Sequence, residues 1–302
     1  MKEIVVYVSG GLGNQLFQYG YAKFLQEKYP NSKIIINTSY YNKNRIRKYE
    51  LCHYVLQKDV EVIDKEDACI TLLIYFNKVI QKVKKRIYFF RWPNILIKKG
   101  FFFGGRIFEC ESIQLKTSKI FLSGYFQEER CMHCMKRDAI YELQMKNAFS
   151  QYVDMFKTKI METKNSIGVS IRVGEDYKKF GWPICSKEFY LAGINYIIEK
   201  KGMSEIFVFA DDIELIMQEQ WFQQYSNVTY IKNCNAVESL ELLKECKNFV
   251  ISNSTFAWWG AYLSKAIDNI VVAPKYFYNG ELLKGSALEM NNMIFFDNYL
   301  SM

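Results

Sequence analysis

Short apolar runs rich in β-branched residues alternate with helix-like segments along most of the chain. The runs with the character of buried parallel strands are Ile4–Val8, Lys33–Asn37, Ile167–Ile171, Ile206–Ala210, Phe249–Ile251 and Ile270–Ala273. The helix-like segments lie at Leu16–Glu27, Lys187–Lys200, Glu238–Cys246 and from Phe256 onward. This alternation predicts an α/β fold built on parallel sheets.

The alternation falls into two series, which predict two domains. An N-terminal β/α domain is expected over residues 1–160 and a C-terminal β/α domain over residues 161–302. The stretch from Asp59 to Phe156 shows no clear period, and we interpret it as mostly helical. Two Rossmann-like domains facing a cleft are the simplest architecture, and their ligands bind beyond the carboxyl ends of the strands.

The composition is that of a folded chain with a large core. Of its 302 residues, half are apolar and 17% are aromatic, which argues against disorder. No apolar stretch reaches the length of about 18 residues that a spanning helix needs, and the first apolar run is too short for a signal peptide. We therefore expect a cytoplasmic protein with reduced cysteines. Cys131-Met132-His133-Cys134 lacks the second ligand pair of a zinc site.

The net charge of +8 is unevenly distributed, because lysines and arginines gather between Lys78 and Arg106 among large apolar residues. Basic and aromatic residues mixed in this way suit the surface of an anionic membrane. A buried aromatic helix with a solvated lysine face is the plainer interpretation. No nucleic-acid-binding motif accompanies the charge. Nucleic acid is therefore not expected as a partner. Peripheral contact with the inner face of the plasma membrane stays open beside the plainer interpretation.

A glycine-rich turn, Gly10-Gly11-Leu12-Gly13-Asn14-Gln15, separates the first strand from the first helix. It is not a dinucleotide fingerprint, because Leu16 stands where the third glycine belongs and no acidic residue ends the second strand. Gly11 and Gly13 would let a backbone approach a ligand closely. The amides of Asn14 and Gln15 could bind hydroxyl or phosphate groups. The alternative is a turn that needs glycine for its dihedral angles.

The strand that ends at Ile171 delivers Arg172 to its carboxyl end, where a fixed cation can bind a diphosphate. Glu175 and Asp176 follow, close enough to pair with the arginine or to accept a proton. An ordinary ion pair at a surface loop is the alternative.

Two carboxylates, Asp211 and Asp212, end another predicted strand. One of them could accept the N–H groups of a guanine edge. The pair could instead bind a divalent ion, or one of them could cap the following helix.

The segment SNSTFAWWGAYL, residues 252–263, joins a strand to an aromatic helix. Its backbone N–H groups and hydroxyls, together with the positive end of the helix dipole, suit a phosphate. The residues involved would be Asn253, Ser254, Thr255 and Phe256. A plain helix cap remains the alternative, since Ser, Asn and Thr are preferred there.

Taken together and in this order, these motifs closely resemble the family 11 glycosyltransferases, the α-1,2-fucosyltransferases. GGLGNQLFQYGYAKFL (residues 10–25) is similar to the N-terminal signature of the bacterial members. Arg47-Lys48-Tyr49-Glu50-Leu51 and Leu122–Gln127 look like secondary blocks of the family. FADD, Leu240–Cys246 and SNSTFAWWGAYL resemble the later blocks, and the last is the most specific.

The resemblance implies a GT-B fold and an inverting, metal-independent transfer from GDP-fucose to a galactose O2. Residues 1–160 would then lie on the acceptor side, and residues 161–302 would bind the nucleotide-sugar donor. The acceptor would be an oligosaccharide or lipid-linked glycan of a bacterial surface polysaccharide such as O-antigen. Arg172 would then neutralise the donor β-phosphate, Ser254 and Thr255 would contact the diphosphate, and Phe256 would lie near the guanine. Asp211 or Asp212 would bind the guanine edge. Asn14 would lie near the reacting carbon, and Asp176 or Glu175 would be the candidate base.

One block departs from the family pattern, which usually reads H-x-R-R-G-D-Y. Here Ser170 replaces the histidine, Val173 replaces the second arginine, and Glu175 looks inserted. The departure leaves open a different nucleotide-sugar donor. Two readings outside this activity also stay open. One is a metal-dependent enzyme that uses Asp211 and Asp212, and the other is a non-catalytic protein that binds glycans or membranes.

Overall fold

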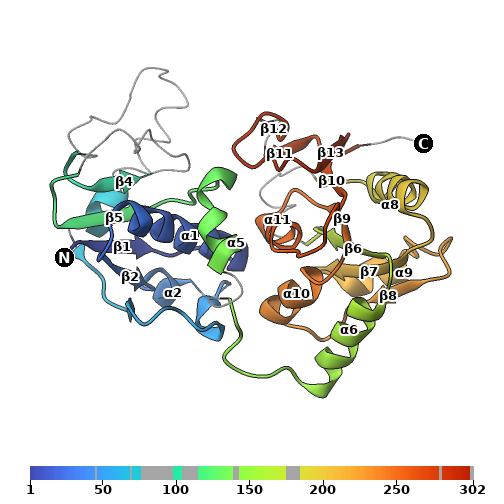
Figure 1. The fold of residues 1–302 in the computed structure, drawn as a ribbon, viewed down its shortest axis with the longest axis horizontal. Coiled ribbons are helices and arrows are strands. Elements are labelled where there is room, and N and C mark those ends of the chain that lie inside the picture. The colour runs from blue at the N-terminus through green and yellow to red at the C-terminus, as the bar shows by residue number, and fades with distance from the viewer. Residues whose placement is uncertain are drawn as a thin grey trace. The chain divides into compact units, whose positions relative to one another are not determined.

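The chain forms two compact α/β units, residues 1–146 and 147–302 (Figure 1). The computed structural model describes residues 1–44, 46–68, 70–75, 98–103, 115–138, 143–174, 184–278 and 281–299. The predicted α/β architecture is confirmed. The units divide before residue 160 because helix α6 (Gln151–Glu162) packs against α10 (Ala236–Leu243), which belongs to the C-terminal unit.

The N-terminal unit is built on a five-stranded sheet whose neighbouring strands are all parallel. Its central strands are fully buried in the middle, with Ile4 and Ile34 at 0% exposure. The order across the sheet is β3 (Val60–Ile63), β2 (Lys33–Asn37), β1 (Glu3–Tyr7), β5 (Lys119–Ser123) and β4 (Phe101–Phe103).

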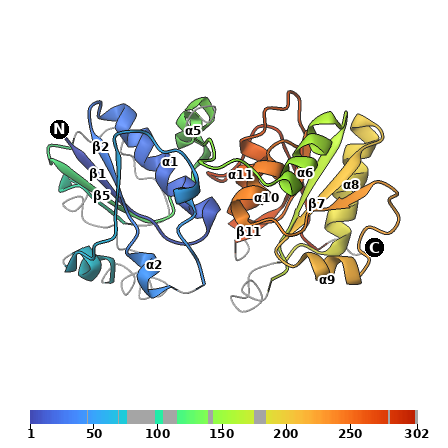
Figure 2. The same cartoon turned by 90° about the horizontal axis from the view of Figure 1, so that it is seen from below.

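Helix α1 (Leu12–Lys28) packs on β1 and β2 (Figure 2). Gly20 in this helix lets Met132 and Met135 approach closely, since a Cβ there would lie 2.6 Å from the Met132 sulfur. The unit also contains α2 (Tyr40–Lys43), α5 (His133–Asp138) and the 3-10 turns Leu51–His53 and Glu129–Cys131.

The prediction that residues 59–156 are mostly helical is wrong for the described part of that stretch, which contains β3, β4 and β5. These strands have only three to five residues, too few for a visible period. Pairing with neighbours distant in sequence decides their conformation, as in the stacking of Phe101 on Phe121 at 5.0 Å between ring centroids. The basic stretch from Lys78 to Arg106 lies mostly outside the described residues.

The C-terminal unit is built on a six-stranded parallel sheet. The order is β13 (Met293–Phe296), β10 (Val271–Pro274), β9 (Asn248–Ile251), β6 (Ser166–Ile171), β7 (Glu205–Ala210) and β8 (Val228–Tyr230). A short antiparallel pair, β11 (Tyr276–Tyr278) and β12 (Glu281–Leu282), accompanies it.

Helices cover both faces of this sheet (Figure 1). On one face α8 (Lys187–Lys201) lies against β6 and β9, with Gly193 allowing Val250 and Val272 to approach. On the other face α10 packs against α11 (Thr255–Tyr262). Helix α9 (Ile213–Gln218) follows β7. None of the helices in the described ranges is long and apolar enough to cross a membrane.

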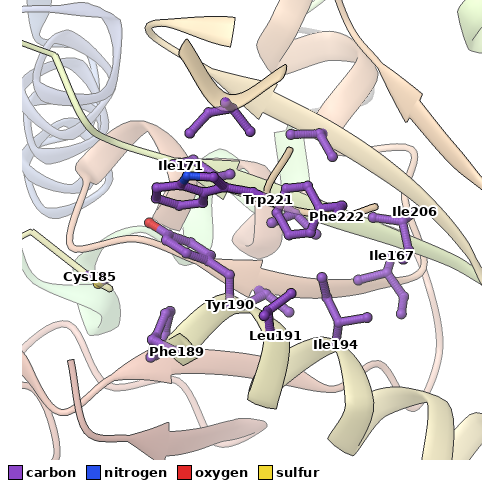
Figure 3. Packing of buried hydrophobic residues seen from close by; sticks show 14 of the residues in the cluster. Ile167, Ile171, Cys185, Phe189, Tyr190, Leu191, Ile194, Ile206, Trp221 and Phe222 are labelled. Carbon is purple, nitrogen blue, oxygen red and sulfur yellow. The ribbon is translucent and has the colours of Figure 1, made fainter. Parts of the chain in front are cut away.

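The core beneath α8 includes a group of packed aromatic side chains and reaches the carboxyl edge of the sheet (Figure 3). Tyr190 and Trp221 lie 5.9 Å apart between ring centroids, and Phe189 packs edge-on against Tyr190 at 5.1 Å. Tyr190 and Phe189 are completely buried. The residues at the strand ends are therefore supported by a closely packed core.

Candidate active site

In the C-terminal unit the carboxyl ends of β6 and β9 flank a topological switch point. From β6 the chain moves outward through β7 to β8, and it then returns to β9 on the opposite side of β6. Ligands of doubly wound sheets bind at such a reversal, because the connections leave the edge in opposite directions. Arg172 follows β6, and residues 252–255 follow β9. The sequence motifs therefore meet at the place where a ligand is expected.

Arg172 is held at this edge by Asp211, which follows the neighbouring strand β7. Its guanidinium Nη1 lies 3.1 Å from Asp211 Oδ2, and the two side chains are 18% and 17% exposed. The strands are in register just before these residues, with Ile171 paired to Ala210. Arg172 therefore forms an ion pair with Asp211. The predicted partners, Glu175 and Asp176, lie outside the described residues, so a pairing with either of them stays a prediction.

The Asp211 carboxylate also shapes the loop after β6. Its Oδ1 accepts a hydrogen bond from Val173 N at 2.9 Å, and its Oδ2 accepts one from Gly174 N at 2.8 Å. Together with Arg172, both oxygens are engaged inside the protein. Asp211 therefore fixes the position of the cation.

Asp212 has a different role, because it caps helix α9. Its Oδ1 accepts from Leu215 N at 3.1 Å, and the residue is exposed. The helix-cap interpretation is therefore confirmed for Asp212. Among the described residues, no group of three or more His, Cys, Asp or Glu side chains is arranged to hold a metal ion.

Helix α11 begins at the switch point with a polar cap. Ser254 Oγ accepts from Phe256 N at 3.3 Å, and Ser254, Thr255 and Phe256 are all half-exposed. Ser252 N donates to Ser170 O at 3.0 Å, which ties the cap to β6. Asn253 is buried and donates from Nδ2 to Phe277 O at 3.1 Å. Ser254 and Thr255 are thus partly exposed to solvent, whereas Asn253 supports the turn.

The paired tryptophans of this motif belong to the core. Trp258 and Trp259 are fully buried, and Trp258 Nε1 donates to Leu288 O at 2.8 Å. Gly260 is required for the packing of α11 on α10, because a Cβ there would lie 2.3 Å from Leu243 Cδ2. Trp258, Trp259 and Gly260 therefore position helix α11 through packing inside the core.

Two buried groups lie close to this edge of the sheet. The Tyr190 hydroxyl lies next to the Arg172 backbone and the Cys185 thiol, and burial raises the pKa of Tyr190 well above its usual range. Burial also raises the pKa of Cys185 to about 12, and its sulfur lies against the Asn253 backbone. Both groups are therefore neutral at neutral pH. Figure 3 shows them at one end of the core.

The N-terminal sheet has its own switch point, between β1 and β5. The glycine-rich turn follows β1: Gly10 has φ +79°, Gly11 is the N-cap of α1, and Gly13 is buried in its first turn. Asn14 is half-exposed, and its Oδ1 accepts from Gln127 Nε2 at 2.9 Å, after β5. Of the residues predicted for this turn, Gly11 and Asn14 reach the surface and Gly13 does not.

The structure contradicts the expectation that Gln15 offers its amide to a ligand. Gln15 is 0% exposed, and its Nε2 donates to Gly10 O and Lys48 O at 3.1 and 2.8 Å. Its Oε1 accepts from Glu50 N at 2.8 Å and Leu51 N at 3.3 Å. A helical side chain at this position points inward, so Gln15 joins the glycine-rich turn to the segment 47–51.

Two α/β units built on parallel sheets are the architecture of the GT-B fold. The sequence profile described as glycosyl transferase family 11 matches residues 3–295. The chain belongs to this family.

Two relatives agree with that assignment, and a solved structure agrees with the fold. The chain is 30% identical to the O-antigen biosynthesis glycosyltransferase WbnK of Escherichia coli, over 95% of this chain and 98% of that one. It is 26% identical to an alpha-1,2-colitosyltransferase of Escherichia coli, over 94% and 95% of the two chains. The fold matches the crystal structure of the fucosyltransferase NodZ from Bradyrhizobium with a TM-score of 0.54 at 12% identity, over 87% of this chain and 93% of that one.

Proposed function

We propose that this protein is an inverting, metal-independent transferase that moves fucose from GDP-fucose to a galactose O2 of a glycan acceptor. The acceptor would belong to a bacterial surface polysaccharide such as O-antigen, as the name of the WbnK relative suggests. The observation that carries the proposal is the convergence of Arg172 and the start of α11 at one switch point.

The reaction mainly requires that the departing GDP be stabilised. As the bond between the sugar and the β-phosphate breaks, negative charge grows on the diphosphate. Arg172 and the N–H groups and hydroxyls at Ser254 and Thr255 would stabilise that charge, and they are already oriented before the donor arrives. In an inverting transfer the acceptor hydroxyl attacks from the opposite face of the sugar. Asp176 or Glu175 would take its proton.

Guanine recognition falls to Asp212 in this proposal. Both carboxylate oxygens of Asp211 already interact with the loop after β6 and with Arg172. Asp212 is an exposed residue, and its helix cap uses only one of its two carboxylate oxygens. A carboxylate oxygen can accept the N–H groups of a guanine edge. Phe256, half-exposed at the start of α11, would pack against the base.

A second candidate keeps the nucleotide and changes the sugar. Val173 occupies the place of a second arginine in the family pattern, and one relative is named a colitosyltransferase. The donor could then carry a deoxyhexose other than fucose on the same GDP.

A thermal-shift panel with GDP, UDP, ADP and CMP, each with and without EDTA, tests the nucleotide. A ligand that binds only the folded protein raises its melting temperature by mass action. The proposal expects a rise with GDP alone, unchanged by EDTA. A rise with UDP, or one that needs metal, would contradict it.

A further inference from the structure

Asn298 is a fully buried amide at the carboxyl edge of the C-terminal sheet. It follows β13, an edge strand, and is 0% exposed, whereas its neighbour Tyr299 is 59% exposed. Asparagine is mostly exposed in folded proteins, and a buried one is held by hydrogen bonds. Asn298 also lies beyond residues 3–295, the part of the chain that the family profile matches. The motifs of the family therefore assign it no role.

The side chain of Asn298 continues the pairing of two parallel strands. Strands β10 and β13 pair as far as Pro274 and Phe296. Two residues further along each strand, Asn298 Oδ1 accepts from Tyr276 N at 2.8 Å, and Asn298 Nδ2 donates to Tyr276 O at 2.8 Å. One side-chain amide thus bonds both backbone groups of the first residue of β11, because it carries a donor and an acceptor.

Strand β11 in turn supports the start of helix α11. The carbonyl oxygen of Phe277, the next residue of β11, accepts from Asn253 Nδ2 at 3.1 Å. Asn253 is 1% exposed and immediately precedes Ser254, the N-cap of α11. Two buried amides, Asn298 and Asn253, therefore bond adjacent residues of β11, and the second belongs to the turn that presents Ser254.

The backbone of Asn298 holds a second helix at the same edge. Its carbonyl oxygen accepts from Ser186 N at 2.8 Å. Ser186 is the N-cap of α8, and its Oγ accepts from Phe189 N at 3.3 Å. Helix α8 packs against β6, the strand that ends next to Arg172. Asn298 thus joins β11 and the start of α8 beside the proposed donor site.

We infer that Asn298 is a positioning residue for the proposed transfer: its amide fixes β11, and through β11 and Asn253 it places Ser254 and Thr255 where they would bind the donor diphosphate. Hydrogen bonds to a phosphate depend on the geometry of their donors. A displacement of about 1 Å caused by a change far from the chemistry can lower a rate about 10²-fold. The inference rests on the proposed function, because it takes the start of α11 to bind the donor.

The test uses the full-length protein with GDP as the binding probe and with GDP-fucose and lactose as substrates. Asn298→Ala removes both side-chain hydrogen bonds and keeps the backbone bond to Ser186. Asn248→Ala is the matched control in the same sheet. Asn248 is 3% exposed, and its Oδ1 accepts from Ile270 N at 3.0 Å at the amino end of β9, the edge opposite to the proposed site.

Titration calorimetry gives the Kd for GDP, and initial rates give kcat and the KM for lactose. Asn298→Ala should raise the GDP Kd and lower kcat, each by at least about tenfold. The KM for lactose should stay within about twofold of wild type. Asn248→Ala should lower the melting temperature too, because it also loses a buried hydrogen bond, but its GDP affinity and kcat should stay within about twofold of wild type.

Asn298→Asp adds a readout that keeps the inference testable even if Asn298→Ala folds poorly. The introduced carboxylate can still accept from Tyr276 N, but it has no proton to donate to Tyr276 O. Protonation restores a donor at that place, and burial favours the protonated form. The GDP affinity of this variant, relative to wild type at the same pH, should therefore recover as the pH falls from about 8 to about 5.

The route through Asn253 is tested by combining two variants. Residues that act through one another are not additive. Adding Asn298→Ala to Asn253→Ala should therefore weaken GDP binding by less than about twofold beyond Asn253→Ala alone.

Three results would overturn the inference. One is a GDP affinity and a kcat that stay at wild-type values in Asn298→Ala and, at every pH, in Asn298→Asp. Another is an equal loss of GDP affinity in Asn248→Ala, which would trace the effect to stability. The third is full additivity in the double variant. Failure of the proposed function is a separate result, since the wild-type protein itself would then not bind GDP.

Discussion

The guanidinium of Arg172 lies 3.1 Å from the carboxylate of Asp211, and both side chains are less than one-fifth exposed. The same carboxylate accepts hydrogen bonds from Val173 N and Gly174 N. The cation is therefore fixed to two adjacent strand ends before any ligand binds. Such preorganisation makes a charge effective in a transition state, because little reorganisation is left to be done.

Replacing Arg172 should reduce catalysis far more than folding. Arg172→Ala removes a fixed cation from the diphosphate, so we expect kcat to fall by about 10²–10³, or about 3–4 kcal/mol of transition-state stabilisation. The control is Lys232→Ala in the same unit, whose ion pair with Glu214 is at the surface and should contribute less than about 1 kcal/mol. Initial rates with GDP-fucose measure both, and near-normal turnover in Arg172→Ala would remove the arginine from the mechanism.

Asp212 provides a test of guanine recognition that does not disturb helix α9. Asn caps helices about as well as Asp, so Asp212→Asn should keep the cap on α9 and the melting temperature. Losing the carboxylate should weaken GDP binding by about tenfold. Titration calorimetry with GDP measures the effect, and UDP serves as the comparison nucleotide. An unchanged GDP affinity would leave Asp212 with its capping role alone.

Gln15 should matter for stability, because its amide is buried and bonded at both ends. Gln15→Leu fills a similar volume but leaves the N–H groups of Glu50 and Leu51 without their acceptor. Each buried polar group left unsatisfied costs about 1–3 kcal/mol. Urea unfolding should therefore show a loss of about 2–6 kcal/mol in the free energy of unfolding. Asn14→Leu, at the half-exposed neighbouring position, is the control, and an equal loss in both variants would contradict the assigned role.

Stability should fall at alkaline pH through buried thiols. Burial raises the pKa of Cys185 to about 12, whereas the thiol of an unfolded chain titrates near 8.5. The folded state therefore keeps a proton that the unfolded state loses, so this stabilisation is complete below about pH 8.5 and decreases as the pH rises. We expect a loss of about 2 kcal/mol between pH 8.5 and 10 from this group.

The measurement is urea unfolding across that pH range. Cys246, also buried with a raised pKa, acts in the same direction. Cys185→Ala should therefore remove only part of the pH dependence of the free energy of unfolding. Cys52→Ala, at an exposed position, should remove less of it. Identical slopes in wild type and Cys185→Ala would refute the prediction.

The order of the motifs was sufficient to predict the α/β fold and the meeting of Arg172 with residues 252–255. Each motif directly follows a buried strand, and in a parallel sheet all carboxyl ends lie at one edge. Chain order alone did not reveal the switch points. These depend on which strands pair, such as β6 with β9 and β1 with β5, and pairing is a non-local property.

The individual roles of neighbouring residues were harder to predict. Asn14 and Gln15 are both amides in one helical turn, yet the first is half-exposed and the second is fully buried. Asp211 and Asp212 likewise point to different partners. One step along the chain changes the direction of a side chain, and only tertiary contacts decide which of the two faces a ligand. The short strands β3 and β4 were missed because three or four residues show no period.

The most direct test of the account is the product formed from GDP-fucose and lactose in the presence of EDTA, identified by proton NMR. The account predicts an α-linked fucose on the galactose O2, since inversion of the β-linked donor gives the α-anomer, and an unchanged rate with the chelator. A β-linked product, a requirement for metal, or transfer only from another nucleotide sugar would contradict it.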